Sequence, residues 1–363
     1  MWSVVRKGIV AAAAVVMMLG IVGPAGAAPK KSFKVAWSIY VGWMPWPYAD
    51  ETGILKKWAD KYGISIQLVQ INDYVESLNQ YTAGAFDGVL ITNMDTLAVP
   101  APGGVDSTAI ILGDYSNGND AVILKSIGLS PKKKTLADIA GQKVNLVQLS
   151  VSQYLLAQAL QTVQLKESDV TLVNTSDADV VAAFGTSDVT AVVTWNPQVS
   201  EILQSHNAQK VFDSSQIPGQ IQDLLVVNTQ ILKENPALAK ALVGTWYEVM
   251  GIMQKNDAAS AEARTQMAKD SGTDLDGFDG QVKTTRLYPD PAEAAQFVRS
   301  KDNVAINDLV RKFCFDHGMM GEGAKSVDLI GIAFPNGTVL GDPKNIKFRY
   351  DPQFMEMAAQ HKL

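Results

Sequence analysis

The sequence has very few of the residues that carry out chemistry in proteins. Its 363 residues include one cysteine, Cys314, and three histidines, His206, His317 and His361, which stand apart along the chain. A lone cysteine cannot form an intrachain disulfide, and isolated histidines do not form the clusters of metal sites or catalytic triads. The sequence has no nucleophile-elbow, phosphate-loop or metal-ligand motif. We therefore expect a protein that is not an enzyme and holds no metal or cofactor.

Basic residues are absent from two long stretches of the chain. No Lys or Arg occurs between Tyr62 and Leu124, or between Glu167 and Gln209, and the formal net charge of the chain is −6. An acidic chain is a poor partner for nucleic acid or for an anionic membrane surface. We therefore expect a small-molecule ligand and no nucleic acid.

The N-terminus has the three parts of an export signal. Arg6 and Lys7 precede an apolar run, which is followed by the small-residue sequence Ala25-Gly26-Ala27. The run is shorter than the roughly 20 apolar residues that a membrane-spanning helix needs. We predict a signal peptide over residues 1–27, cleavage after Ala27 and a periplasmic location.

The first third of the chain alternates between strand and helix patterns. Strands are predicted over 33–40, 64–71 and 86–93, and helices over 49–63 and 73–84. Such alternation indicates a parallel sheet with helices on both faces. Ligands of these sheets bind outside the carboxyl ends of the strands. The loops that follow the strands are therefore the places to look for a site.

The rest of the chain repeats the alternation of strand and helix patterns and then becomes mainly helical. A second strand–helix unit begins near Lys134 and continues to the strand pattern that ends at Thr194. From Asn235 onward the pattern is mainly helical. The two units predict two related α/β lobes, with a helical region that returns to the first.

Several short motifs recur in the same order in both units. Gly84-Ala85-Phe86-Asp87 and Gly185-Thr186-Ser187-Asp188 each precede a predicted strand, and Trp195-Asn196-Pro197 follows the last strand of the second unit. Over residues 33 to 255 this order resembles the periplasmic solute-binding proteins of nitrate/taurine/alkanesulfonate-type ABC importers. Its aromatic-rich first loop makes the chain most similar to members associated with urea carboxylase, which are described as urea or guanidine importers.

The resemblance implies a type II periplasmic-binding-protein fold, with each lobe a mostly parallel sheet covered by helices. It implies one lobe over 28–124 and 224–363 with the helical C-terminal region, and a second lobe over 125–223. It further implies a monomer that passes its ligand to a membrane permease and its ATPase. The same fold hosts pyrimidine synthases that use iron, histidine and a cysteine cluster, but this chain has no cysteine cluster.

The stretch SIYVGWMPWPYADETG, residues 38–53, gathers aromatic residues between a predicted strand and a helix. Its prolines and glycine predict irregular backbone, and its rings suggest one wall of a binding cleft. Three acidic residues, Asp73, Asp95 and Asp114, also follow predicted strands, whereas Asp87, Asp120 and Asp188 are interpreted as turn residues. The candidate ligand-binding residues are Trp43, Trp46, Tyr48, Asp73, Tyr74, Asn93, Asp95, Asp114, Ser152 and Trp195.

Aromatic walls and carboxylates without a nearby base favour a planar cation. Guanidinium is flat and weakly hydrated, its N–H groups suit a carboxylate, and its face stacks on Trp or Tyr. Nitrate or a sulfonate would need Arg, Lys or free backbone amides. The alternatives that stay open are urea, a thiamin-type pyrimidine, a sulfonate, or an enzyme resembling a pyrimidine synthase on the same fold.

Overall fold

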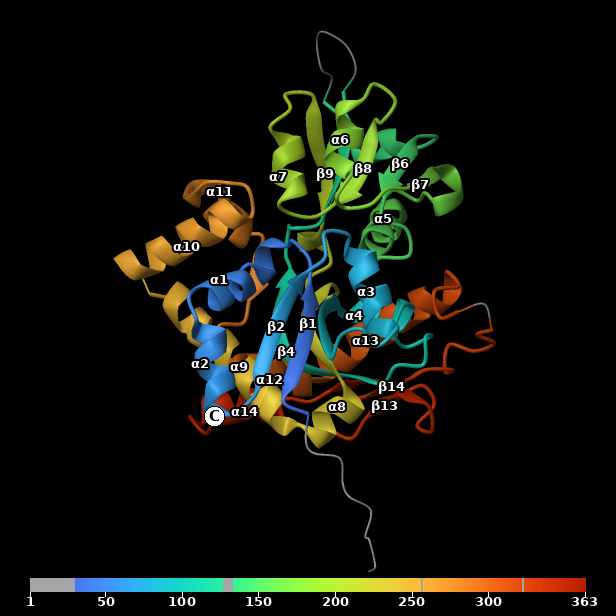
Figure 1. The fold of residues 1–363 in the computed structure, drawn as a ribbon. Helices are drawn as coiled ribbons and strands as arrows, with labels where there is room; N and C mark the ends of the chain where they lie inside the picture. Colours follow the sequence, from blue (N-terminus) through green and yellow to red (C-terminus); the bar gives the residue numbers. More distant parts are fainter. Residues whose placement is uncertain (1–29, 127–132, 256, 322) are drawn as a thin grey trace, which may run out of the picture.

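The computed structural model describes residues 30–126, 133–255, 257–321 and 323–363. The predicted signal peptide at 1–27 lies outside these residues. The described chain forms two α/β lobes, each built on its own sheet (Figure 1). The predicted fold class is therefore confirmed.

Sheet A is the centre of the larger lobe, at the bottom of Figure 1. Its order is β13-β12-β14-β4-β10-β3-β1-β2, and β11 pairs with the far end of β4. The strands are β1 (Ser32–Trp37), β2 (Ser65–Gln70), β3 (Gly88–Thr92), β4 (Ser107–Ser116), β10 (Gln222–Asn228), β11 (Thr285–Leu287), β12 (Gly331–Ala333), β13 (Val339–Leu340) and β14 (Ile346–Tyr350).

Sheet B is the centre of the smaller lobe, at the top of Figure 1, and has the order β7-β6-β8-β5-β9. Its strands are β5 (Ala121–Lys125), β6 (Lys143–Leu146), β7 (Thr171–Asn174), β8 (Ala191–Thr194) and β9 (Ala208–Asp213). The helices of this lobe are α5 (Val151–Thr162), α6 (Val180–Gly185) and α7 (Gln198–Leu203).

The remaining helices belong to the larger lobe. They are α1 (Pro45–Glu51), α2 (Ile54–Lys61), α3 (Tyr74–Thr82), α4 (Asn93–Ala98), α8 (Thr229–Glu234), α9 (Pro236–Met253), α10 (Ala258–Asp270), α11 (Leu275–Val282), α12 (Pro291–Arg299), α13 (Lys301–Asp316) and α14 (Gln353–Ala359). None of the helices within the described residues has both the length and the apolar content needed to cross a membrane.

Both sheets are mixed, and the reason lies in how the chain crosses between lobes. The neighbours β1, β2 and β3 are parallel, as are β6, β7 and β8, whereas β10 and β5 run antiparallel to their partners. Each of these two strands is the first after a crossing, so it starts at the edge that faces the other lobe. The chain passes from sheet A to sheet B between residues 116 and 121, and it returns to sheet A between residues 213 and 222. The lobe boundaries predicted at 124 and 223 lie within a few residues of these changes of sheet, and they stay a prediction.

The predicted irregular backbone of residues 38–48 is wrong, because most of this segment is helical. A 3-10 turn spans Val41–Trp43 and α1 begins directly afterwards at Pro45, where a proline needs no N–H partner. The helix predicted over 49–63 is instead split into α1 and α2 by Gly53, whose φ of 76° suits glycine. The aromatic residues therefore project from two short helical turns.

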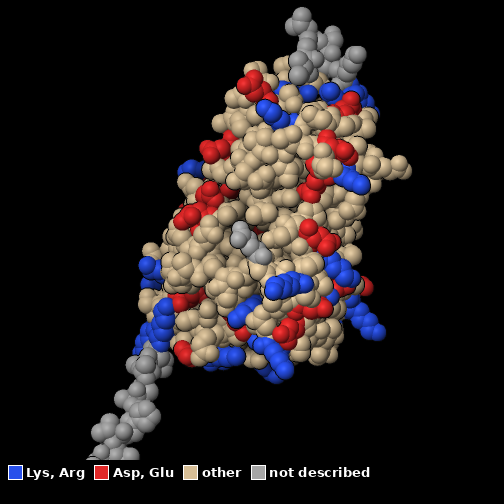
Figure 2. Space-filling model, turned by 90° about the vertical axis from the view of Figure 1, so that its right-hand side faces the viewer, with Lys and Arg blue, Asp and Glu red and all other residues tan. Residues whose placement is uncertain are grey.

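The C-terminal region also differs from the sequence pattern. Between α13 and α14 the chain forms β12, β13 and β14, and β14 pairs in parallel with β4. These strands cover an edge of sheet A that would otherwise present unpaired backbone groups. On the face shown in Figure 2, acidic and basic side chains are interspersed, unlike the continuous basic surface of a nucleic-acid-binding protein.

Candidate functional site

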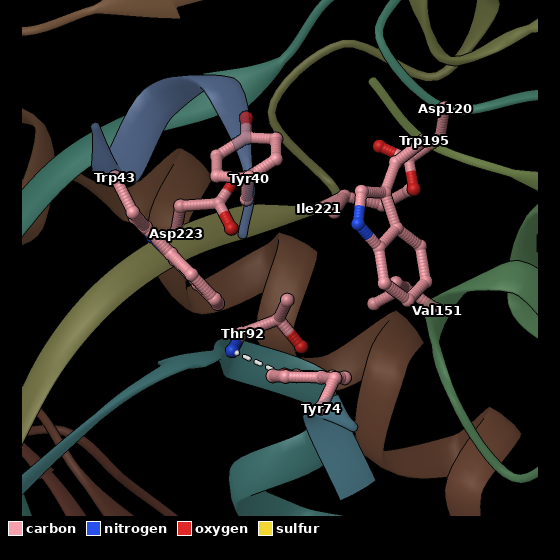
Figure 3. A pocket seen from close by; sticks show the side chains of 9 residues that line it. All are labelled: Tyr40, Trp43, Tyr74, Thr92, Asp120, Val151, Trp195, Ile221 and Asp223. Atoms are coloured by element: carbon pink, nitrogen blue, oxygen red, sulfur yellow. Dashed lines mark hydrogen bonds between the residues drawn. The ribbon is translucent and has the colours of Figure 1, made fainter. Parts of the chain in front are cut away.

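A small cavity lies where the two lobes meet. A space of about 20 Å³ inside it admits the centre of a water-sized sphere, and the cavity measures about 300 Å³ with its mouth included. The inner space holds one or two waters. Its lining comes from both lobes and from the crossing segments: Tyr40, Trp43, Tyr74, Thr92, Asp120, Val151, Trp195, Ile221 and Asp223 (Figure 3).

Four aromatic rings form a continuous wall of the cavity. The ring centroids of Tyr40 and Trp43 lie 5.1 Å apart, those of Trp43 and Tyr74 lie 5.8 Å apart, and those of Tyr74 and Trp195 lie 5.8 Å apart. The planes of neighbouring rings are tilted or edge-on. Several ring faces are therefore free to contact a flat ligand from different directions.

Each ring is placed by the element that carries it. Tyr40 and Trp43 follow the buried strand β1, and Trp195 directly follows β8. Tyr74 is the first residue of α3, which begins there because the Asp73 side chain accepts a hydrogen bond from the backbone N–H of Glu76. The rings thus sit at carboxyl ends of strands and at a capped helix start.

Two tyrosines in the wall are held by carboxylates behind them. The Tyr40 hydroxyl donates to Oδ1 of Asp114 at 2.7 Å, and the Tyr74 hydroxyl donates to Oδ2 of Asp95 at 2.7 Å. The Thr92 hydroxyl donates to the same oxygen of Asp95 at 2.8 Å. Burial raises the pKa of Asp95 to about 6, although these hydrogen bonds oppose the rise.

Two further carboxylates line the cavity itself. In Figure 3, Asp223 lies with Tyr40 and Trp43 on one side of the view, and Asp120 lies with Trp195 on the other. Burial raises the pKa of Asp120 to about 7 and holds the pKa of Asp223 well above its usual range. No Lys, Arg or His is among the described residues that line the cavity. Its charged groups are therefore all acidic.

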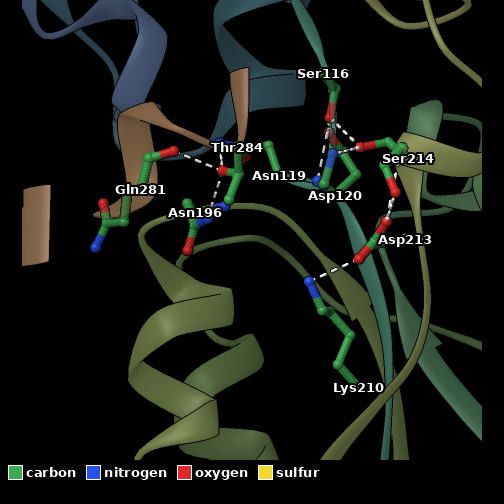
Figure 4. A network of polar contacts seen from close by, with 11 residues as sticks. Ser116, Asn119, Asp120, Asn196, Lys210, Asp213, Ser214, Gln281 and Thr284 are labelled. Atoms are coloured by element: carbon green, nitrogen blue, oxygen red, sulfur yellow. Dashed lines mark hydrogen bonds and ion pairs between the residues drawn. The ribbon is translucent and has the colours of Figure 1, made fainter. Parts of the chain in front are cut away.

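Asp120 also belongs to the crossing between the lobes. Its carboxylate accepts from the Ser116 hydroxyl, and its backbone carbonyl accepts from the N–H of Ser214 at 3.0 Å (Figure 4). The hydroxyls of Ser116 and Ser214 lie 2.6 Å apart. Nearby, Thr284 of the larger lobe accepts from the side-chain amides of Asn119 and Asn196, each at 3.2 Å. One network therefore ties the crossing segments to the cavity.

The structure brings some of the sequence candidates together and leaves others apart. Trp43, Tyr74 and Trp195 line the cavity, and Asp95 and Asp114 lie directly behind it. Asn93 is buried nearby and bonds backbone groups of residues 220 and 222. Ser152 is buried beside Val151, and its hydroxyl has no hydrogen-bond partner among the described residues.

Besides Asn93, Asp95, Asp114 and Ser152, three more candidates lie outside the cavity lining. Trp46 stacks on Trp246 in the core, with ring centroids 5.5 Å apart, because α1 turns it away from the cleft. Tyr48 is half-buried on the same helix. Asp73 is used as the cap of α3. None of the three lines the cavity.

Several lining residues were not among the sequence candidates: Tyr40, Thr92, Asp120, Val151, Ile221 and Asp223. Asp120 was interpreted as a turn residue, which it is, but its carboxylate also faces the cavity. Asp223 stands at the start of β10, and nothing local in the sequence distinguishes it from an ordinary strand residue. The one available signal was that both aspartates flank the crossings between the two units.

The lobes also contact each other around the cavity. The Tyr74 N–H donates to Oδ1 of Asp177 at 3.1 Å, and Nε2 of His317 lies 2.6 Å from a carboxylate oxygen of Glu167. Asp177 and Glu167 belong to the smaller lobe, whereas Tyr74 and His317 belong to the larger one. The described arrangement is therefore one in which the lobes touch.

Replacing His317 by Gln should destabilise the protein more at pH 6 than at pH 9. The hydrogen bond to Glu167 raises the pKa of His317, and the helix end beside it also favours the charged ring. The stabilisation is complete below the pKa of an unfolded histidine, and it is lost as pH rises through the higher folded value. We expect a loss of about 1 kcal/mol at pH 6.

Thermal unfolding at the two pH values measures this difference. The exposed His206, changed to Gln, is the matched control and should show no such pH difference. An equal effect of the His317 change at both pH values would contradict the ion pair.

Comparison with known proteins identifies the family and the fold of the chain. Residues 26–268 match the model of the NMT1-like family. The alkanesulfonate-binding protein SsuA from Xanthomonas axonopodis pv. citri, bound to MOPS, superposes with a TM-score of 0.67 at 15% identity, covering 82% of this chain and 96% of that chain. No curated protein gives a significant sequence match.

Two further solved structures support the same fold. The periplasmic aliphatic sulphonate binding protein SsuA from Escherichia coli has a TM-score of 0.64 at 18% identity, covering 80% of this chain and 94% of that chain. The periplasmic nitrate-binding protein NrtA from Synechocystis PCC 6803 has a TM-score of 0.55 at 13% identity, covering 93% and 100%. At these identities the likeness shows a shared fold, that of periplasmic binding proteins.

Proposed function

The chain belongs to the NMT1-like family, and from this premise and the cavity we propose that it is the solute-binding protein of an ABC importer for a small planar cation. The favoured ligand is guanidinium. The protein would work in the periplasm after export and would deliver its ligand to a membrane permease and its ATPase. Within the family this places it beside the urea-carboxylase-associated members.

One observation carries the proposal: two buried carboxylates share a cavity with four aromatic rings, and its described lining has no basic side chain. Asp120 and Asp223 supply negative charge, and the lining includes no Lys, Arg or His among the described residues. Buried carboxylates without a cationic partner are costly, so an arrangement of this kind favours a cationic ligand that neutralises them. An anion in the same place would face repulsion from both groups.

The same residues account for a flat ligand. The N–H groups of guanidinium can donate to a carboxylate in pairs, and its face can stack on Trp or Tyr. A cation–π contact in a desolvated site contributes about 2 kcal/mol. Together with charge neutralisation this is compatible with micromolar affinity, on the order of −8 kcal/mol.

The size of the cavity supports a small ligand. The space inside it is close to that of one or two waters, and guanidinium has only four heavy atoms, so a modest parting of the walls admits it. A long-chain sulfonate would need the lobes to open much further. Lobe closure around the ligand would be a hinge motion about the crossing segments.

A sulfonate is the second candidate, and one observation favours it. The structural relatives are named for alkanesulfonate and nitrate binding, and Val151, at the start of α5, lines the cavity. Backbone N–H groups at a helix start attract anions. Urea and a thiamin-type pyrimidine also fit aromatic walls, but neither requires two carboxylates. An enzymatic role would require turnover by the purified protein.

A thermal-shift screen should separate these ligands. Guanidinium at millimolar concentration should raise the melting temperature of the purified protein by several degrees, because a ligand at about 100 times its Kd adds roughly 2.7 kcal/mol. Urea at the same low concentration, nitrate and taurine should give smaller shifts or none. Potassium chloride serves as the ionic-strength control. A shift with taurine or nitrate and none with guanidinium would reject the cation proposal.

A further inference from the structure

Asp114 and Asp223 face each other across two strands of sheet A. They are directly paired residues of the antiparallel strands β4 and β10. Side chains of such a pair lie on the same face of the sheet, with Cβ atoms about 5 Å apart. Each of the two carboxyl groups acts on the pKa of the other. The pair is fully buried, and its Asp223 member lines the cavity.

Each member of this pair has an oxygen that lacks a hydrogen-bond donor. Oδ2 of Asp114 and Oδ2 of Asp223 are buried without a partner in the described residues. Two ionised carboxylates in contact repel each other, and each unpaired buried oxygen adds a further cost. A single proton held between the two groups removes the repulsion and gives the ionised member a donor.

Backbone packing covers the Asp114 side of the pair. A Cβ atom on Gly42 would lie 2.4 Å from Oδ2 of Asp114 and 2.4 Å from a ring carbon of Tyr40. The glycine therefore lets the turn after β1 lie directly over the carboxyl group. Water cannot readily approach Oδ2 of Asp114 from this side, so a proton shared with Asp223 is the simplest donor to that oxygen.

Within the part of the chain that the structure describes, no cation is among the groups that act on the pKa of either aspartate. The Tyr40 hydroxyl donates to Asp114, and Asp120 adds further negative charge. On the far side β11 pairs with β4, but its Arg286 is bound to the exposed Glu293. The other titratable groups near the pair are the ring hydroxyl of Tyr288 and, beyond Asp120, the carboxyl of Asp95.

We propose that Asp114 and Asp223 hold one shared proton in the ligand-free protein, and that a bound cation displaces this proton to solvent. The ligand in this exchange is the one of the proposed function, whereas the shared proton rests on the structure alone. The O–H bond of the carboxyl pair breaks, its electron pair stays on the carboxylate, and the proton passes to buffer. The cation then neutralises the charge that the proton had neutralised.

The exchange links affinity to pH. Burial raises the pKa of both members in the free protein, and a cation beside Asp223 lowers them again. Binding therefore releases a proton at any pH where the free pair still holds it. Affinity should rise about tenfold per pH unit in that range and level off above it.

Titration calorimetry with guanidinium chloride tests the exchange. The observed heat at pH 7 is compared between phosphate and Tris, which differ in their heats of ionisation. We expect the difference to correspond to about one proton released per guanidinium. Urea, the neutral analogue of the same shape, should release none if it binds. Guanidinium binding without proton release would overturn the shared proton and leave the proposed function intact.

The Asp114→Asn variant identifies the source of the proton. An asparagine amide donates permanently where the shared proton donates reversibly, so this variant should release little or no proton and show a flat pH dependence of affinity. The Asp73→Asn change, at a half-buried helix cap outside the cavity, is the matched control and should release the same amount as the wild type. Unchanged release from Asp114→Asn would assign the proton elsewhere and overturn the proposal.

A ligand-free measurement covers the case in which guanidinium does not bind. That result would reject the proposed function, and the pair is then tested by thermal unfolding between pH 5 and 9. A proton held only in the folded state means that stability falls as pH rises. Wild type should therefore lose more melting temperature over this range than Asp114→Asn, or than Asp223→Asn if the first variant folds poorly. Equal pH slopes in wild type and variant would overturn the shared proton.

Discussion

Replacing Asp223 by asparagine should weaken guanidinium binding by about 100-fold, on the order of 3 kcal/mol. The substitution keeps the shape of the side chain but removes the negative charge that faces the cavity. A cation in a buried site then loses its partner while Asp120 remains. The amide NH₂ group would also point a donor at a ligand that has only donors to offer.

The measurement is a calorimetric titration at the highest pH at which both proteins stay folded, where release of a proton from the wild-type pair affects affinity least. Asp73→Asn is the matched control, because asparagine caps a helix as well as aspartate does and residue 73 lies outside the cavity. Without ligand at this pH, the same Asp223→Asn protein should be more stable than wild type, because its amide can donate to Asp114 without needing a bound proton. Wild-type affinity in Asp223→Asn would exclude this carboxylate as the cationic partner.

Two tryptophans three residues apart should respond to substitution in opposite ways. Trp46→Ala should lower the free energy of unfolding by about 3–5 kcal/mol, because it removes a fully buried ring that stacks on Trp246. Trp43→Ala should instead weaken guanidinium binding by about 30-fold, the loss of one cation–π wall worth about 2 kcal/mol.

Denaturant unfolding and ligand titration, each applied to both variants, separate the two roles. Trp46→Phe, which keeps a stacking ring, is a milder substitute if the alanine variant does not fold. Folded Trp46 variants should bind guanidinium nearly as the wild type does. A large loss of affinity in a stable Trp46→Phe protein would show that α1 shapes the cavity more directly than the packing indicates.

The architecture could be predicted from the sequence because it depends on repeating local patterns. Strand and helix periodicities set the order of elements, and the rule that ligands bind at carboxyl ends of strands directed attention to Trp43, Tyr74 and Trp195. The role of Asp73 was also readable, since an aspartate followed three residues later by Glu76 is a helix-start pattern.

Other parts of the site depend on contacts that no local pattern records. Asp223 reaches the cavity because β10 inserts between β3 and β4, a pairing between residues more than 100 positions apart. Trp43 lines the cavity and Trp46 packs in the core because a helix begins at Pro45. The proline and glycine residues of this stretch instead suggested a loop. A helical turn rotates successive side chains by about 100°, so a loop interpretation could not separate the two rings.

Asp120 lines the cavity and also joins the two segments that cross between the lobes. A residue with both roles is hard to replace during evolution, because a new side chain that suits another solute would also alter the contacts between the crossing segments. Divergence of specificity among descendants of this protein should therefore be concentrated at positions with one duty, such as Trp195 and Val151. Position 120 should then vary least among the lining residues, even between lineages that import different compounds.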